Sequence, residues 1–364
     1  MAYHTDKWAN RKQEADVRSA VRAWGIDAQE VRAVSGGFSG AAVFRVDTAD
    51  DRRFAARAIP SSTATSLKRQ TQIMQMLAFI HQSGMNCVAA PRQLRAASHA
   101  LPPVASPVNA WFSRQAKRLW QVSLWRDGSP VGKTELDPDR AAAAIGIVHE
   151  FHALAYEWAE RHNSDELTPR DGPSLAVLKR RQILQTLADG ELSTLSTQIH
   201  RLSSPLHESS EQLVGVLRRH LPKLIQDTES AAAGRWRLQP VIRDLWKQHV
   251  LFTESRVTGL VDFWECASDH VFVDFSRLFR SWAGADNILV SRLWRETLRG
   301  HLIRQADRQL LDVLDACTVL LSPLTWLRRF LTSESDQFSP QAVNRFQALV
   351  DVAASFRPFE MELR

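Results

Sequence analysis

Two aspartates around one short predicted hairpin constrain the fold and chemistry of this chain more than any other feature of its sequence. The apolar runs VLF (250–252) and GLVDF (259–263) flank the polar turn TESR, a pattern typical of two paired strands. Asp244 comes shortly before the first strand, and Asp262 is predicted to lie inside the second. A carboxylate in an apolar strand is costly to bury unless it pairs or binds a cation. The two could therefore face one pocket, one accepting a proton and the other holding a metal ion.

Residues 239–282 resemble the catalytic segment of the aminoglycoside phosphotransferase / choline kinase family, a branch of the protein-kinase-like fold. The family pattern is roughly H-G-D-x-x-x-x-N, a strand, and a strand ending in I-D-F or I-D-W. This chain has I-R-D-L-W-K-Q-H and V-D-F at the matching places. The resemblance implies that Asp244 is the catalytic base, that Asp262 binds the metal ion, and that Asp274 braces the catalytic loop.

The same segment departs from the family pattern at three positions. Ile242 and Arg243 replace the His and Gly, and His249 replaces the Asn that is the second metal ligand. Because Mg²⁺ prefers oxygen, neutral imidazole is a poor ligand for it. Three alternatives stay open: one metal binds, His249 donates to a phosphate, or a softer ion such as Mn²⁺ replaces Mg²⁺. Arg243 could stabilise the transferred phosphoryl group or lower the pKa of Asp244.

The N-terminal part predicts a small sheet that begins with a strand, a glycine-rich turn and a second strand. The turn is SGGFSG (35–40), whose backbone N–H groups could approach phosphate oxygens. A plain hairpin turn explains the same glycines, and no G-K-[ST] follows, so this is not a P-loop. The resemblance implies that the turn covers nucleotide phosphates through Gly36, Gly37, Phe38 and Ser39.

A third strand is predicted at 51–60 and a helix at 66–84, with Leu67, Ile73, Met74 and Leu77 on one face. The resemblance implies that Arg57 contacts the nucleotide phosphates, whereas a solvated strand arginine is the simpler alternative. Gln70 stands where the family has a Glu that pairs with the basic residue. Gln70 can hydrogen-bond Arg57 but adds no charge, so that ion pair is weakened or absent.

The remaining sequence is predicted to be mostly helical. Asp137 is a good N-cap for a long Ala-rich helix, whose histidines 149, 152 and 162 indicate packing rather than a metal site. Residues 163–235 correspond to the part in which relatives carry their acceptor-substrate helices. Two basic runs could form an anion surface, although such runs are usually solvated faces: Lys179, Arg180 and Arg181, and Arg218, Arg219 and His220.

These features predict an α+β, protein-kinase-like bilobal fold for the 364 residues. A small N-terminal antiparallel β-sheet lobe with one main helix would bind nucleotide (1–125). A large, mostly helical C-terminal lobe would carry the catalytic and acceptor-substrate residues (126–364).

The composition of the chain restricts the classes of partner and the cellular location that we expect. The net charge of +6 suits an anionic ligand such as a nucleotide, and no basic stripe interleaved with aromatics predicts nucleic-acid binding. Three widely spaced cysteines indicate reduced core thiols. No apolar run approaches the roughly 20 residues of a membrane helix, and the N-terminus is not a secretory signal. We therefore expect a cytoplasmic protein that does not bind membranes; the sequence leaves its oligomeric state open.

The expected function is ATP-dependent transfer of the γ-phosphoryl group to a hydroxyl of a small metabolite, with Mg²⁺ or Mn²⁺. The alternative is a catalytically degenerate pseudokinase that acts as a ligand-binding or interaction scaffold. Ile242, Gln70 and His249 favour the alternative, whereas Asp244 and Asp262 favour the enzyme.

Overall fold

The structure is a computed structural model that describes residues 13–34, 41–60, 67–95, 106–107, 109–115, 117–162, 166–299, 304–333 and 338–358. The chain divides into two compact units, Met1–Ser129 with Leu251–Trp264, and Pro130–Val250 with Glu265–Arg364. The hairpin that carries Asp262 thus belongs with the N-terminal unit, whereas Asp244 belongs to the second. A lobe boundary at residue 125 stays a prediction.

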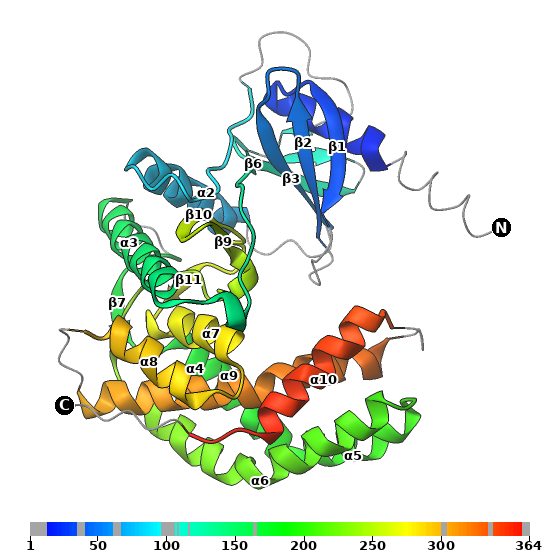
Figure 1. The fold of residues 1–364 in the computed structure, drawn as a ribbon, viewed down its shortest axis with the longest axis vertical. Coiled ribbons are helices and arrows are strands. Elements are labelled where there is room, and N and C mark those ends of the chain that lie inside the picture. The colour runs from blue at the N-terminus through cyan, green and yellow to red at the C-terminus, as the bar shows by residue number, and fades with distance from the viewer. Residues whose placement is uncertain are drawn as a thin grey trace. The chain divides into compact units, whose positions relative to one another are not determined.

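A six-stranded antiparallel sheet forms the centre of the first unit (Figure 1), in the order β1-β2-β3-β6-β5-β4. Alternating apolar residues bury one face of β2 and β3, where Phe44, Val46 and Phe54 join a core with Trp120. A helix at 13–21 and the 3-10 turn η1 (Arg22–Trp24) cover this core, and Gly25 ends the turn at φ +68°. The strands are β1 (Ala28–Val34), β2 (Ala42–Thr48), β3 (Arg53–Pro60), β4 (Ser106–Pro107), β5 (Ser113–Gln115) and β6 (Arg118–Leu124).

Helix α2 (Leu67–Gln82) and the hairpin β9 (Val250–Thr253) and β10 (Arg256–Leu260) complete this unit. The predicted helix and hairpin are confirmed, but the position of Asp262 is a correction. Asp262 lies two residues beyond β10 rather than inside it. Its backbone φ of +65° is incompatible with a strand, and the Leu260 backbone N–H instead donates to the carbonyl of Cys87 at 2.8 Å.

The second unit is mostly helical, with one small antiparallel sheet in the order β11-β8-β7. Asp137 Oδ1 accepts the Arg140 N–H at 2.8 Å and so caps the long helix, as predicted. The helices are α3 (Pro138–His162), α4 (Leu175–Thr186), α5 (Leu192–Gln198), α6 (Leu206–Ala232), α7 (Phe272–Ala283), α8 (Asn287–Thr297), α9 (Gln305–Thr332) and α10 (Pro340–Ala354); the strands are β7 (Arg170–Gly172), β8 (Trp236–Val241) and β11 (Ala267–Asp269).

Helix α9 is the core helix of this unit and contacts α6, α7 and α10. Contrary to the expectation from sequence, it is long and apolar enough to cross a membrane, but 78% of its apolar window is buried inside the protein. Arg280 of α7 reaches it through a buried ion pair, with Nε 2.6 Å from Asp315 Oδ1. The apolar character of α9 therefore serves packing within the unit.

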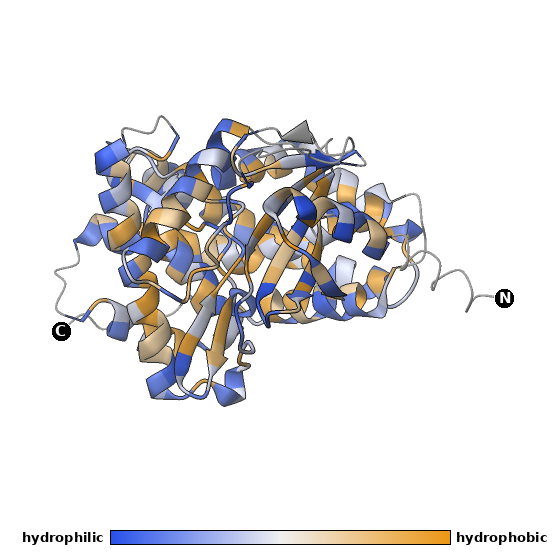
Figure 2. Ribbon diagram, turned by 90° about the horizontal axis from the view of Figure 1, so that it is seen from above, coloured by the Kyte–Doolittle hydropathy of each residue, from blue (hydrophilic) through white to orange (hydrophobic). Residues whose placement is uncertain are grey.

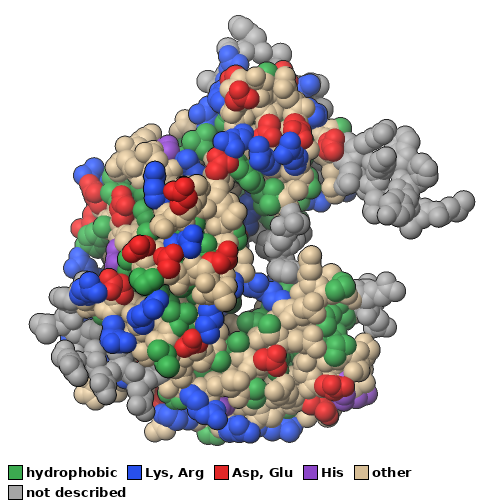
Figure 3. All heavy atoms as spheres, in the orientation of Figure 1, with side chains coloured by type: hydrophobic (Ala, Val, Ile, Leu, Met, Phe, Trp, Pro, Cys, Tyr) green, Lys and Arg blue, Asp and Glu red, His purple; other side chains and the backbone are tan. Residues whose placement is uncertain are grey.

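Charged side chains of both signs lie on the face of the molecule that Figure 3 draws. Hydrophobic and hydrophilic bands alternate along the strands and helices (Figure 2), as expected where one side of each element is buried. On the face drawn in Figure 3, Lys and Arg are interspersed with Asp and Glu over the second unit. The three cysteines are buried thiols outside any disulfide, as the sequence predicts.

A half-buried histidine before α7 predicts acid sensitivity of the fold. His270 Nδ1 accepts the Phe272 N–H at 3.2 Å, and burial lowers the pKa of His270 from 6.5 to about 4. Because the unfolded chain takes up this proton more readily, the free energy of unfolding should fall as pH drops from about 6.5 to 4, by up to about 3 kcal/mol.

Urea unfolding across this pH range measures the effect. His270→Gln keeps an acceptor for Phe272 and should flatten the pH dependence, whereas His200→Gln, at an exposed position, should leave it as in the wild type. An equally steep dependence in His270→Gln would show that other groups cause it.

Candidate active site

A fully buried carboxylate fixes the loop that follows β8. Asp274, in the first turn of α7, accepts the Ile242 N–H at 2.8 Å and the Arg243 N–H at 2.6 Å. Its Oδ2 also lies 2.8 Å from His152 Nε2 of α3, which donates because a carboxylate only accepts. Arg243 has a backbone φ of +67°, a conformation that costs about 1–3 kcal/mol and persists only where surrounding contacts enforce it. Asp274 supplies those contacts.

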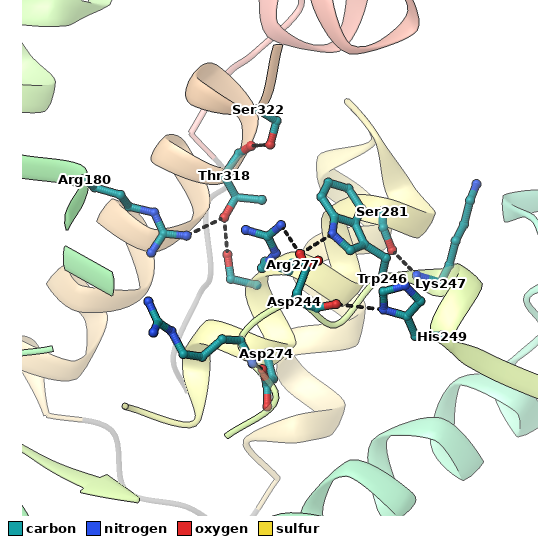
Figure 4. Close-up of polar contacts among 12 residues, drawn as sticks. Arg180, Asp244, Trp246, Lys247, His249, Asp274, Arg277, Ser281, Thr318 and Ser322 are labelled. Carbon is teal, nitrogen blue, oxygen red and sulfur yellow. Dashed lines mark hydrogen bonds and ion pairs between the residues drawn. The ribbon is translucent and has the colours of Figure 1, made fainter. Parts of the chain in front are cut away.

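Asp244 projects from this loop with one carboxylate oxygen engaged (Figure 4). Oδ1 accepts from Trp246 Nε1 at 2.7 Å and from Arg277 Nη2 at 2.5 Å, and the side chain is 38% exposed. Oδ2 makes no hydrogen bond within the part of the chain that the structure describes. The loop thus presents an oriented carboxylate whose second oxygen is open to a ligand.

Arg277 and His152 are partners that the sequence did not assign to the site. Arg277 follows Asp274 by three residues on α7, so the two share a helix face, and that spacing was a usable signal. Its guanidinium carbon lies 4.8 Å from the ring centroid of Trp246. His152 was read only as a packing residue, because nothing in the sequence connects α3 with a residue 122 positions later.

His249 and Lys247 close the loop through backbone contacts. His249 Nδ1 lies 2.8 Å from the carbonyl oxygen of Asp244, so this nitrogen carries the proton. The backbone N–H of Lys247 donates to Ser281 Oγ at 2.8 Å (Figure 4). His249 therefore holds the backbone of Asp244 in place through this hydrogen bond.

The side chain of Arg243 is directed to a second buried carboxylate. Its Nε lies 3.9 Å from Asp269 Oδ2, and Asp269 also accepts from Ser174 Oγ at 2.6 Å and the Ala176 N–H at 2.7 Å. No hydrogen bond joins the Arg243 guanidinium to Asp244 among the described residues. An influence of Arg243 on Asp244 or on a phosphoryl group stays a prediction.

In the first unit, Arg57 of β3 pairs with Asp262. Arg57 Nη1 lies 2.6 Å from Asp262 Oδ1, and the guanidinium carbon is 5.3 Å from the ring centroid of Trp264. Gln70 could hydrogen-bond Arg57 by its position in the sequence, but its Nε2 instead donates to the carbonyl of Trp264 at 3.0 Å. A carboxylate is a stronger partner for a guanidinium than a neutral amide, so Asp262 takes the place predicted for Gln70.

The described residues offer a carboxylate that could hold a metal ion together with oxygen atoms of a ligand. No group of three or more His, Cys, Asp or Glu that could hold an ion occurs in the described ranges. Mg²⁺, however, commonly uses one or two carboxylates and completes its shell with phosphate oxygens and water. Asp262, 37% exposed, supplies such a carboxylate. Gly36, Gly37, Phe38 and Ser39 lie outside the described residues.

The fold is that of kinase-like small-molecule phosphotransferases, and solved structures show the likeness over most of the chain. Amicoumacin kinase hAmiN in complex with AMP-PNP, Ca²⁺ and Ami has a TM-score of 0.62 at 12% identity, with 98% of this chain and 97% of that chain covered. Aminoglycoside phosphotransferase from Alicyclobacillus acidocaldarius subsp. acidocaldarius has 0.59 at 13%, covering 93% and 92%. Plasmodium vivax ethanolamine kinase has 0.52 at 12%, covering 89% and 81%.

A profile of the phosphotransferase enzyme family matches residues 30–315. The chain therefore belongs to the phosphotransferase enzyme family. No curated protein sequence matches it significantly.

Proposed function

We propose that this protein transfers the γ-phosphoryl group of ATP to a hydroxyl of a small molecule. The observation that carries the proposal is the loop after β8, in which a buried Asp274 holds the backbone and Asp244 keeps Oδ2 open. A positive φ and a buried carboxylate each lower the stability of the folded chain. Such a loop is therefore expected where it serves a function. Family membership and the kinase-like fold support the same assignment.

Asp244 acts as the base in the proposed reaction. The acceptor oxygen forms a bond to the γ-phosphorus while its proton passes to Asp244 Oδ2. The bond between that phosphorus and the β,γ-bridging oxygen breaks, and ADP leaves with the electron pair. Trp246 and Arg277 hold Oδ1, so the carboxylate is oriented before the acceptor binds.

The first unit supplies the nucleotide-binding groups in this proposal. Arg57 contacts the α- and β-phosphates, the backbone around Gly36, Gly37, Phe38 and Ser39 covers them, and Asp262 holds the metal ion. When bound, Mg²⁺, or Mn²⁺ in its place, neutralises charge that develops on the phosphate oxygens. Gln70 acts indirectly, because its bond to the Trp264 carbonyl fixes the segment after Asp262.

We favour a single metal ion among the alternatives for His249. Its Nδ1 proton is already committed to the Asp244 carbonyl, and imidazole is a poor ligand for Mg²⁺. In this proposal His249 maintains the loop, and it takes no part in metal binding. The protein acts in the cytoplasm on a nucleotide and a small hydroxylated metabolite.

The pseudokinase alternative is favoured by one contact, the ion pair between Arg57 and Asp262, which engages the proposed metal ligand. Acceptor-dependent release of ADP distinguishes the two functions. We would test cationic, neutral and anionic hydroxylated compounds with Mg²⁺ and with Mn²⁺. Release of ADP that depends on one class supports the enzyme, whereas nucleotide binding without release in any class supports the scaffold.

A further inference from the structure

One residue of the basic run 179–181 is directed into the protein, although such runs usually face solvent. Lys179 and Arg181 on α4 are exposed. Arg180 is partly buried, and its Nη2 donates to Thr318 Oγ1 of α9 at 3.3 Å (Figure 4). A hydroxyl carries no charge, so this contact leaves the charge of the guanidinium uncompensated.

Arg180 has no carboxylate partner within the described residues, and its Nη1 is buried without a hydrogen-bond partner. Burial is the main cause that lowers the pKa of Arg180; Cys317 and Asp269 oppose it, and the charges of Arg277 and Arg243 add to the lowering. Arg180 therefore lies close enough to Arg277 and to Arg243 to be repelled by each, and Asp269 offsets part of this repulsion.

Arg277 connects this cluster with the proposed base. Its Nη2 contacts Asp244 Oδ1, whereas its Nε is buried without a partner. Arg345 of α10 adds a fourth guanidinium, 5.4 Å from the Trp246 ring centroid, and Asp244 raises the pKa of Arg345 against the larger lowering by burial. The surroundings of Asp244 are thus rich in desolvated cations.

Removing guanidinium N–H groups from water without giving them an acceptor is costly, and grouping them adds repulsion. A bound anion would offset both costs. An ammonium-bearing acceptor would add to the repulsion instead. Because Arg277 contacts the proposed base, an anion bound to Arg277 would lie close to the acceptor hydroxyl.

We propose that the acceptor is a hydroxylated compound that carries a carboxylate or phosphate group, and that Arg180 and Arg277 bind this anionic group while Asp244 receives the hydroxyl proton. This inference rests on the proposed function for the role of Asp244. The anion site itself does not, because it follows from unpartnered guanidinium nitrogens. The γ-phosphate of the nucleotide is the other source of the same chemistry.

The test measures binding of inorganic phosphate to the full chain by calorimetry, with and without saturating ADP. The wild type should bind phosphate saturably, and Arg180→Gln should weaken binding about 10- to 100-fold, the loss expected for a charge-assisted hydrogen bond. Arg180→Lys should recover part of the affinity. Lys179→Gln removes one charge from an exposed position on the same helix and should bind as the wild type does.

Equal phosphate affinity in Arg180→Gln and wild type, or no binding by the wild type, would overturn the proposal. AMP-PNP and ADP titrations separate the two anion sources. If Arg180→Gln weakens AMP-PNP as strongly as phosphate but spares ADP, the site holds the γ-phosphate and the proposal is wrong. If ADP and AMP-PNP fail to bind the wild type, the proposed function fails, while the phosphate titration still decides the anion site.

Discussion

Asp244→Asn should lower kcat for phosphoryl transfer by about 10²- to 10⁴-fold and leave nucleotide affinity nearly unchanged, as expected when a general base is removed. Asn has the same shape, and its Oδ1 can still accept from Trp246 and Arg277. It cannot take up the proton of the acceptor hydroxyl. The loop therefore keeps its geometry and loses its base.

Slow hydrolysis of ATP, with water as the acceptor, gives a readout before the natural acceptor is identified. Asp171→Asn, which removes an exposed carboxylate from β7 of the same unit, serves as the matched control. If Asp244→Asn turns over as fast as this control, Asp244 is not the base.

Asp274→Ala should lower the free energy of unfolding by about 3–5 kcal/mol. The substitution leaves hydrogen-bond donors that are buried beneath the loop without an acceptor. The Ile242 N–H, the Arg243 N–H and His152 Nε2 would all lose their acceptor. The positive φ of Arg243 would also lose the contacts that enforce it. We therefore expect turnover to be lost together with stability.

Urea unfolding measures this loss. Asp274→Asn keeps the shape and one acceptor oxygen, so it should cost clearly less than Asp274→Ala. A loss below about 1 kcal/mol for the alanine variant would mean that the loop is held by other contacts.

The elements that local sequence patterns encode were predictable. Apolar alternation defines β2 and β3, and Ser339 followed by Pro340 is a local helix-start signal: the side chain of Ser339 caps α10 by accepting the Ala342 N–H. The fold class followed from the order of motifs, and the family comparison confirms it. Short motifs single out the two aspartates around the hairpin, and their roles stay predictions.

The side-chain network of the site was not predictable, because it depends on contacts between distant segments. Asp262 lies beyond its strand in a left-handed conformation that no local pattern signals. Gln70 contacts a backbone carbonyl 194 residues away instead of the neighbouring strand. The inward direction of Arg180 depends on Thr318, which is 138 residues distant. The periodicity of a sequence predicts which face of a helix or strand is buried, but it does not predict which distant residue a side chain contacts.

Thermal unfolding with ATP, with and without Mg²⁺, tests the central claim most directly. A ligand that binds only the folded chain stabilises it by about 2.7 kcal/mol at 100 times its Kd. We predict that ATP with Mg²⁺ raises the Tm of the wild type by several degrees, that EDTA removes most of the shift, and that Asp262→Ala abolishes its metal dependence. An equal shift with EDTA, or an unchanged metal-dependent shift in Asp262→Ala, would contradict the assignment of Asp262 as the metal ligand.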